Sequence, residues 1–295
     1  MNDSVKAYQI SMRLQGMIAL LRIRQWIKNV FVLAPLLFTG EFLNVQSVNN
    51  ALLTMLFFSL ASSATYIIND IHDVEHDRKH PKKSKTRPLA SGVVSIRSAL
   101  ILLIIVLLTV LLCVGLVMPN VLQIIIFYLL LNLSYTFFLK YQPVLDIFSI
   151  AISFVLRVYA GAIALAVPVS DWMFITTLCL ALYLASLKRR QELSLSGTEG
   201  RAVLQKYSVF LVNRYAEMSA TGALLFYALY VMTAKPQLVS SIPVVLFGLF
   251  RYWYIADTLD GGESPTDALL SDWPLLLTII TWVLVCGWVL WPIQG

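Results

Sequence analysis

The chain has 295 residues, of which 59% are hydrophobic and only 13% are charged, and it carries a formal net charge of +6. Soluble globular domains carry about 25% charged residues, so this composition excludes an ordinary soluble protein and indicates a membrane protein. The positive charge does not indicate a nucleic-acid partner, because the basic residues lie beside apolar runs and no soluble domain is left to read a nucleic acid; membrane lipids and phosphorylated substrates are the expected partners.

The N-terminal segment, residues 1–24, is basic, and it is weakly amphipathic over residues 4–22. Such a pattern predicts a helix that lies in the membrane interface, with a disordered tail as the alternative. Residues 25–292 are then expected to form a transmembrane bundle. Residues 1–295 would make a single all-α, polytopic membrane domain.

Nine apolar segments follow, and most are long enough to cross a hydrocarbon core about 30 Å thick. Helices are expected, because backbone polar groups cannot stay unpaired in lipid and the segments are continuously apolar rather than alternating. The first segment is short and contains Pro35, which should kink it. The nine predicted spans are residues 26–39, 48–68, 98–118, 121–139, 145–167, 171–187, 213–234, 240–256 and 273–291.

Basic residues are concentrated in alternate connections between these spans, and the opposite connections carry almost none. By the positive-inside rule, the N-terminus is cytoplasmic and the C-terminus is outside, as expected for a multi-pass protein of the inner (plasma) membrane. The long connections lie on the cytoplasmic side, where we expect the active site. The two richest hold Arg78, Lys79, Lys82, Lys83, Lys85, Arg87 and Arg97 after the second span, and Lys188, Arg189, Arg190, Arg201, Lys206 and Arg214 after the sixth.

An acidic cluster lies at the end of the second span. On one helix, Asn69, Asp70, Asp73 and Asp77 would share an arc of about 100°. Three carboxylates on one face repel each other, and a divalent cation removes that repulsion. Oxygen ligands suit Mg²⁺, which commonly bridges to substrate phosphates. The sequence therefore predicts a Mg²⁺ site made by the three aspartates.

Other metal-binding patterns are weaker. His72 and His76 are four residues apart, which would suit a transition metal, but they should point away from the acidic face. Cys113, Cys179 and Cys286 lie inside apolar runs without a C-x-x-C spacing, so a redox or zinc site is not expected.

A basic loop follows the acidic cluster directly. Carboxylates, a metal ion and basic side chains together suit a diphosphate group. We expect Lys85 and Arg87 to contact substrate. For Lys79, Lys82 and Lys83, the alternative is that they only set the topology and bind lipid head groups.

A second cluster lies at the cytoplasmic end of the sixth span, where Lys188 and Arg189 are four and three residues before Glu192. A helix end with one salt bridge is the alternative to a phosphate site. Two further charges lie within the fifth span. Asp146 begins it, and Arg157 lies eleven residues later, about 16 Å along a helix. A charge at that depth lines a cavity, or else bonds to backbone carbonyls.

These residues resemble the UbiA superfamily of membrane prenyltransferases, and most closely its decaprenyl-phosphate phosphoribosyltransferase branch. The superfamily motif is Asn69-Asp70-x-x-Asp73-x-x-x-Asp77, and the pattern Lys188-Arg189-x-x-Glu192-Leu193 points to the branch. Ordinary prenyltransferases of the superfamily typically carry a second Asp-rich motif after the sixth span, which is replaced here by basic residues with Glu192 and Glu199. The resemblance extends over residues 21–29, 66–77, 85–92, 145–146, 156–157, 160–161, 188–193 and 251–252.

The resemblance implies transfer of a phosphoribosyl group from phosphoribosyl diphosphate to a polyprenyl phosphate, with Mg²⁺ as cofactor and a homo-oligomer as a further expectation. It implies Asp73 and Asp77 as catalytic metal ligands, assisted by Asp70, and Lys188, Arg189 and Glu192 as further catalytic residues. The expected substrate-binding residues are Tyr66, Asn69, Asp70, Lys85, Arg87, Tyr135, Lys28, Lys140, Asp146 and Arg157.

Two alternatives remain open from the sequence. One is an aromatic or lipid prenyltransferase of the same superfamily, which would share the first acidic motif and differ in its substrates. The other is a secondary transporter or lipid flippase that uses Asp146 and Arg157 along a pathway, although no internal repeat supports it. The acidic residues of the last cytoplasmic loop carry no assigned role: Asp257, Asp260, Glu263, Asp267 and Asp272.

Overall fold

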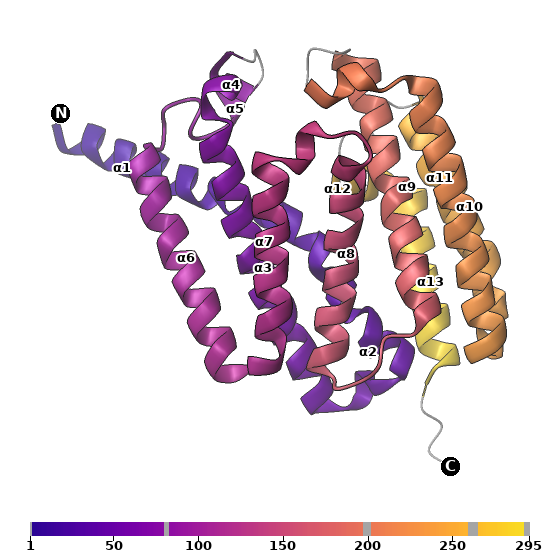
Figure 1. The fold of residues 1–295 in the computed structure, drawn as a ribbon. Helices are drawn as coiled ribbons and strands as arrows, with labels where there is room; N and C mark the ends of the chain where they lie inside the picture. The colour runs from indigo at the N-terminus through magenta and orange to yellow at the C-terminus, as the bar shows by residue number, and fades with distance from the viewer. Residues whose placement is uncertain (1, 80–82, 197–201, 259–264, 292–295) are drawn as a thin grey trace.

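The computed structural model describes residues 2–79, 83–196, 202–258 and 265–291. Over these residues the chain is all-helical, without a β-strand (Figure 1). Several predicted residues lie outside the described ranges, namely Lys82, Glu199, Arg201, Asp260 and Glu263.

By length and composition, six of the described helical segments could cross a membrane: Val45–His72, Ile96–Val117, Pro119–Phe137, Leu145–Ala164, Asp171–Ser194 and Pro236–Thr258. A seventh apolar helix, Trp273–Val289, is shorter. The expected total of nine spans is therefore not confirmed. The helix Val209–Ala234, which carries Arg214 and Glu217 near its start, is not among the six.

The N-terminal segment forms α1 (Asn2–Leu20), which runs across the bundle near one end instead of along it (Figure 1). The chain then forms the 3₁₀ helix η1 (Ile23–Leu33) and the short helix α2 (Ala34–Thr39). The expected continuous span over residues 26–39 is thus divided. Pro35 does not kink a longer helix but lies in the first turn of α2, where a missing N–H is tolerated.

The remaining helices follow in chain order and run mostly along the bundle (Figure 1). They are η2 (Glu41–Leu43), α3 (Val45–His72), α4 (Val74–Lys79), α5 (Lys83–Thr86), α6 (Ile96–Val117), α7 (Pro119–Phe137), η3 (Leu139–Tyr141), α8 (Leu145–Ala164), α9 (Asp171–Ser196), η4 (Ala202–Lys206), α10 (Val209–Ala234), η5 (Pro236–Ser241), α11 (Ile242–Thr258), α12 (Pro265–Ser271) and α13 (Trp273–Val289).

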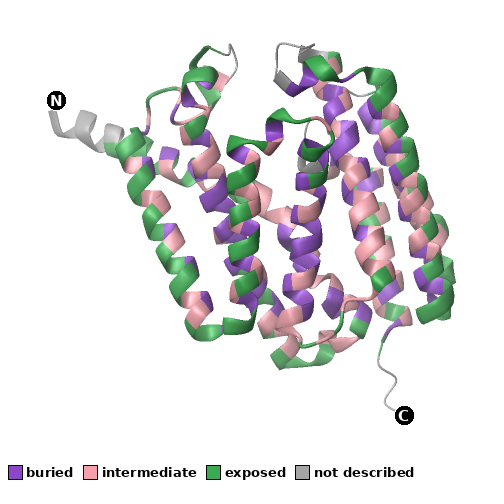
Figure 2. Ribbon diagram, viewed as in Figure 1, coloured by how far each residue is buried: buried purple, intermediate pink, exposed green. Residues whose placement is uncertain are grey.

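Two helices form the centre of the bundle. Figure 2 shows α3 and α8 as its most buried helices, whereas α6 and α7 expose much of their length. On α6, Val106, Val110 and Val114 pack inward while leucine and isoleucine side chains face outward. An outward face made of large apolar side chains is what contact with lipid requires, because a soluble monomer rarely exposes such a patch.

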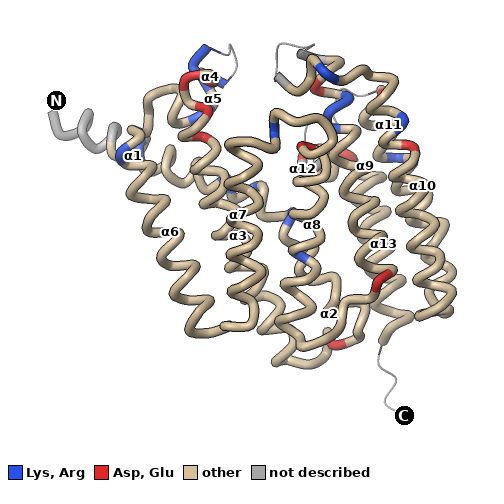
Figure 3. The backbone as a smooth tube through the Cα atoms, viewed as in Figure 1, with Lys and Arg blue, Asp and Glu red and all other residues tan. Residues whose placement is uncertain are grey.

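The close approach of η1 to α8 depends on Gly161. A Cβ atom at this position would lie 1.9 Å from the carbonyl oxygen of Val32, so only glycine lets the two backbones meet. This contact draws the 3₁₀ helix into the bundle and positions Asn29, which is fully buried. The charged residues gather mainly at the end of the bundle that carries α4 and α5 (Figure 3).

Candidate active site

The acidic motif spans a break between two helices. Helix α3 ends at His72, and Asp73 takes the position between α3 and α4 with φ −90° and ψ 2°. The backbone still follows a helical course, because the N–H of Asp73 bonds to Asn69 and the N–H of Asp77 bonds to Asp73. The expectation of one unbroken helix over this motif is therefore corrected to two helices that meet at Asp73.

Asp70 and Asp77 converge on one cation. Both are buried, and Nη1 of Arg87 contacts Oδ1 of Asp70 at 3.1 Å and also Oδ2 of Asp77. Arg22 donates a second bond to Oδ1 of Asp70 at 2.5 Å, and Lys83 lies 3.6 Å from Asp77. Arg87, a predicted substrate contact, thus joins Asp70 and Asp77, two of the predicted metal ligands.

Asp73 faces a different set of partners. Its carboxylate accepts bonds from Lys140 at 2.7 Å and from the amide of Asn69 at 3.1 Å, and the ring of His72 lies 2.8 Å away. His72 therefore does not point away from the acidic residues, as the helical spacing had predicted. Burial alone would raise the pKa of the Asp73 carboxyl, but hydrogen bonds from Lys140 and His72 more than offset this, so its pKa lies below its ordinary value.

The donor chemistry of the motif fits a divalent cation. Among the described residues, no three His, Cys, Asp or Glu side chains lie close enough together to hold a metal ion on their own. However, Asp70 and Asp77 already surround one positively charged nitrogen, that of Arg87. Mg²⁺ usually takes one or two protein carboxylates and completes its shell with water and substrate phosphate oxygens. The motif can therefore contribute to a shared metal–phosphate site.

The second predicted cluster is organised around the buried side chain of Arg189. Its three nitrogens reach three partners: Nε donates to Asp146 at 2.6 Å, Nη1 to Glu192 at 2.6 Å and Nη2 to the hydroxyl of Tyr135 at 3.1 Å. The side chains of Arg189 and Asp146 are 1% and 0% exposed. Lys188 precedes Arg189 on α9 and is half-buried. Four of the predicted residues thus form one network.

Tyr207 completes this network, and the sequence did not single it out. Its hydroxyl donates to Oδ1 of Asp146 at 2.6 Å and accepts the backbone N–H of Val144 at 2.6 Å. Val144 has φ 69°, which is unusual for a β-branched residue and indicates local strain. Burial and the hydrogen bond to Asp146 raise the pKa of Tyr207.

The connection between α7 and α8 joins the acidic motif to the Arg189 network. Within it and at its two edges, Tyr135 bonds to Arg189, Lys140 pairs with Asp73, and Asp146 pairs with Arg189. A single short segment thus links residues from α3 and α9 that are far apart in the sequence. The acidic motif and the Arg189 network are therefore the two faces of one candidate site, and this segment joins them.

Arg157 does not join either cluster. Its guanidinium donates to Asn29 at 2.7 Å, to the carbonyl of Ser153 at 2.5 Å and to the hydroxyl of Tyr128 at 3.3 Å. The aromatic rings of Phe58, Tyr128 and Phe154 also lie against it. These bonds satisfy a buried charge inside the bundle, which matches the structural alternative.

The other predicted contacts are more loosely placed. Tyr66 lies under the guanidinium of Arg22, 5.0 Å from its ring centre. Lys85 is exposed on α5 and Lys28 is half-buried on η1. Neither lysine makes a hydrogen bond or ion pair with the described part of the chain.

The acidic residues without a predicted role mostly form ion pairs. Asp257 pairs with Arg190, and Asp267 on α12 pairs with Arg24 at 3.0 Å. Asp272 pairs with Arg251 at 2.7 Å and caps the first turn of α13 through the N–H of Leu275 at 2.8 Å.

Comparisons with known proteins place these residues in a family context. The model of the UbiA prenyltransferase family matches residues 31–271. A decaprenyl-phosphate phosphoribosyltransferase of Mycobacterium tuberculosis is 32% identical over 286 residues, covering 92% of this chain and 93% of that protein. A protein of the same name from Corynebacterium glutamicum is 32% identical over 285 residues, covering 91% of this chain and 84% of that protein.

A solved structure shares the fold. The structure of a UbiA homologue from Archaeoglobus fulgidus bound to GPP and Mg²⁺ matches with a TM-score of 0.72 at 19% identity, covering 94% of this chain and all of that one. This likeness shows a UbiA-like arrangement of helices.

Proposed function

The chain belongs to the UbiA prenyltransferase family, and from this membership we propose that it transfers the 5-phosphoribosyl group of phosphoribosyl diphosphate to a polyprenyl phosphate of the decaprenyl type, releasing diphosphate. Two relatives that match it over most of their length carry the phosphoribosyl group and the decaprenyl phosphate acceptor in their names. The chain is a multi-pass membrane transferase, and we place its active site on the cytoplasmic face, with the N-terminus cytoplasmic and the C-terminus outside.

The observation that carries the choice of donor is the basic end of α9. Where a second acidic motif would serve a prenyl diphosphate, this helix carries Lys188 and Arg189, and its nearby Glu192 is bonded to Arg189. Phosphoribosyl diphosphate has an additional 5-phosphate, and cationic side chains are the groups that bind phosphate oxygens. The charge of this helix end therefore suits the more heavily phosphorylated donor.

The acidic motif would hold the diphosphate of the donor through Mg²⁺. Asp70 and Asp77 converge on one cation position, and Asp73 and Asn69 lie next to them. When bound, the ion would stabilise negative charge on the leaving diphosphate. Arg87, which now bridges the two carboxylates, would be free to contact phosphate once a metal ion replaces it there.

The remaining predicted residues would position the two substrates. The side chain of Arg189 is too buried for extensive contact with a substrate. We therefore assign it the role of orienting Glu192 and Tyr135 toward the ribose hydroxyls. Lys188 would contact the donor's phosphates. Lys28 and Lys140 would add positive potential that attracts the lipid phosphate.

In the reaction, an oxygen of the lipid phosphate attacks the anomeric carbon of the ribose. A new carbon–oxygen bond forms while the bond to diphosphate breaks, and diphosphate leaves with the bonding electron pair. The nucleophile is already an anion, so no strong general base is needed. Catalysis then consists mainly of positioning and of electrostatic stabilisation of the leaving group.

The test is product identification with the purified full chain, Mg²⁺, phosphoribosyl diphosphate and a short-chain polyprenyl phosphate. Mass spectrometry of the lipid should show the phosphoribosyl adduct with the wild-type protein and none after EDTA. Asp73→Ala should lower turnover at least about 100-fold, because it removes charge stabilisation at the leaving group. The control is Asp171→Asn, at the opposite end of α9. Normal turnover by Asp73→Ala would contradict the assignment of this site.

A further inference from the structure

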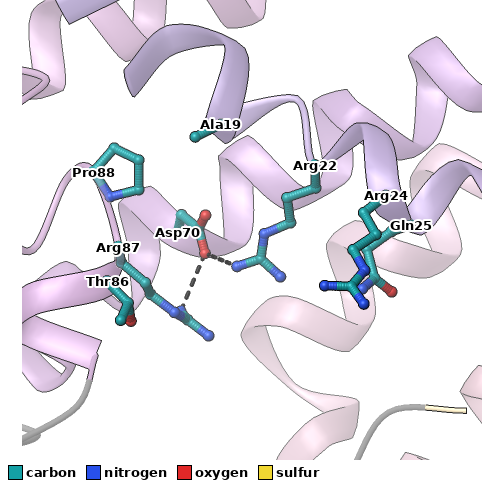
Figure 4. A pocket seen from close by; sticks show the side chains of 8 residues that line it. All are labelled: Ala19, Arg22, Arg24, Gln25, Asp70, Thr86, Arg87 and Pro88. Carbon is teal, nitrogen blue, oxygen red and sulfur yellow. Dashed lines mark hydrogen bonds and ion pairs between the residues drawn. The ribbon is translucent and has the colours of Figure 1, made fainter. Parts of the chain in front are cut away.

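A cavity of about 320 Å³ opens beside the acidic motif, on the side where α1 meets η1. Figure 4 shows its lining, in which Arg22 and Arg87 lie on either side of Asp70 and Arg24 lies beyond Arg22. Gln25 and Thr86 also line it. We call this cavity the arginine pocket. Its lining carries three guanidinium groups and one carboxylate, that of Asp70.

The three arginines are held in different ways. Arg22 and Arg87 both donate to Oδ1 of Asp70, at 2.5 Å and 3.1 Å, so this carboxylate fixes two guanidinium groups side by side (Figure 4). Arg24 is 66% exposed and pairs with Asp267 at 3.0 Å on the surface. Such an exposed pair is weak and can exchange its carboxylate for another anion.

The backbone of Arg22 has an unusual conformation, which indicates that this arrangement serves binding. Arg22 has φ 49° and ψ 47°, a left-handed conformation that is uncommon for residues other than glycine. Arg22 stands at the junction between α1 and η1, and its side chain reaches Asp70. Strain of this kind persists where the surrounding structure enforces it, and it gathers at binding sites.

The helix beside the pocket indicates its depth. On α1, Ile10, Leu14 and Ile18 are four residues apart and are 66%, 54% and 48% exposed. An exposed apolar stripe on a basic helix is typical of a helix embedded in the head-group region of a membrane. Gly16 lets α1 pack closely against the rest of the protein, because a Cβ at this position would lie only 2.7 Å from the side chain of Val94.

We propose that the arginine pocket seats the phosphate group of the polyprenyl phosphate acceptor. The inference rests on the proposed function and adds the acceptor's position to it. A phosphate monoester at head-group depth can reach this pocket without leaving the interface, and arginine binds phosphate through paired N–H donors. Arg87 reaches both the pocket and Asp77, so the acceptor's oxygen lies next to the site of the donor's diphosphate.

Arg157, a buried charge on α8, would bind this phosphate less well. Its guanidinium already bonds to Asn29, Ser153 and Tyr128. Binding an anion there would require breaking those bonds inside the bundle. In the arginine pocket, the exposed Arg24 can turn to a phosphate and give up only a surface pair.

The test compares Arg24→Gln with Arg78→Gln in the full chain reconstituted in vesicles. Both changes remove one positive charge from the same end of the protein, but Arg78 lies on α4, is paired with Glu75, and does not line the pocket. Loss of one charge-assisted bond to phosphate should raise the KM for polyprenyl phosphate about tenfold in Arg24→Gln. The KM for phosphoribosyl diphosphate should stay within about twofold of the wild-type value, as should both constants in Arg78→Gln.

A binding measurement separates this inference from the proposed function. Short-chain polyprenyl phosphate is titrated into the protein without a donor, and its affinity should fall about tenfold in Arg24→Gln whether or not phosphoribosyl transfer occurs. Competition with inorganic phosphate and with phosphatidylglycerol vesicles identifies the source of the anion. Equal displacement by either competitor would overturn the assignment to the acceptor. A rise in the donor's KM instead of the acceptor's, or equal behaviour of the two variants, would overturn it too.

Discussion

Replacing Asp146 with Asn should destabilise the folded protein by about 3 kcal/mol, because it leaves the charge of Arg189 inside the bundle without one of its two carboxylate partners. Both side chains are almost fully buried, and the bond between them is 2.6 Å long. Removing one member of such a pair costs about 3–5 kcal/mol in general. We expect the lower end of that range, because Glu192 also bonds to Arg189 and keeps part of the charge compensated.

The double variant Asp146→Asn/Arg189→Met tests the reason for this loss. Removing the buried cation as well should recover at least about half of the lost stability, because an apolar pair avoids the desolvation of an unpaired charge. The assay is reversible unfolding in mixed detergent micelles, followed by the helical circular dichroism signal. The exposed Asp171→Asn serves as the control and should change stability by less than about 0.5 kcal/mol.

Two results would refute this reasoning. The first is a loss below about 1 kcal/mol in Asp146→Asn, which would mean that the pair is solvated and not buried. The second is a double variant that loses as much stability as the sum of the two single variants, since independent sites add. Either result would remove the support for Arg189 as the residue that orients Glu192 and Tyr135.

Three further changes test separate parts of the structure. Gly161→Ala should lower the unfolding free energy by about 3 kcal/mol or more, because its Cβ would meet a backbone oxygen of η1 at 1.9 Å, whereas Gly287→Ala, with open space around it, should have little effect. Arg157→Met should lower stability by about 1–3 kcal/mol, because it leaves the buried oxygens of Asn29, Ser153 and Tyr128 without their hydrogen-bond donor. The KM for polyprenyl phosphate should not rise in proportion to this loss of stability. The hydrogen bond from Arg251 lowers the pKa of Asp272, so this carboxylate stabilises the fold above its unfolded pKa of about 3.9, and the contribution is lost as the pH falls further. The melting temperature of the wild type should therefore fall more steeply on acidification below about pH 4 than that of Asp272→Asn, and parallel curves would contradict this origin.

The apolar pattern was sufficient to predict most of the long helices. The predicted segments 98–118, 121–139 and 273–291 correspond to α6, α7 and α13 within a few residues, because their outward faces must be apolar along their whole length. The segment 26–39 could not be predicted in this way. Its division into η1 and α2 depends on the close approach of Val32 to Gly161, a contact between residues far apart in the sequence.

The residues of the site were easier to predict than their partners. The spacing of Asp70, Asp73 and Asp77 identified an acidic cluster, but it did not show that Asp73 turns to Lys140, which lies 67 residues away. Likewise, no local pattern marks Tyr207, whose importance comes from a bond to Asp146 across 61 residues.

Arg22 was a residue that the sequence could have indicated more strongly. It stands in residues 21–29, which carry part of the family resemblance, but no role was predicted for Arg22 itself. Its left-handed backbone conformation and its bond to Asp70 are properties of the folded chain. Only the structure shows that Ala19 of α1, Arg24 of η1 and Asp70 of α3 line one pocket with Arg22.

The most direct test of the central claim is a choice between donors. Purified protein with Mg²⁺ is given labelled phosphoribosyl diphosphate with a short-chain polyprenyl phosphate in one reaction, and labelled prenyl diphosphate with an aromatic acid in another. We predict that label passes from phosphoribosyl diphosphate into the lipid and that EDTA abolishes this transfer. Label that passes only from prenyl diphosphate to the aromatic acid would contradict the proposed donor, while leaving the fold and the family unchanged.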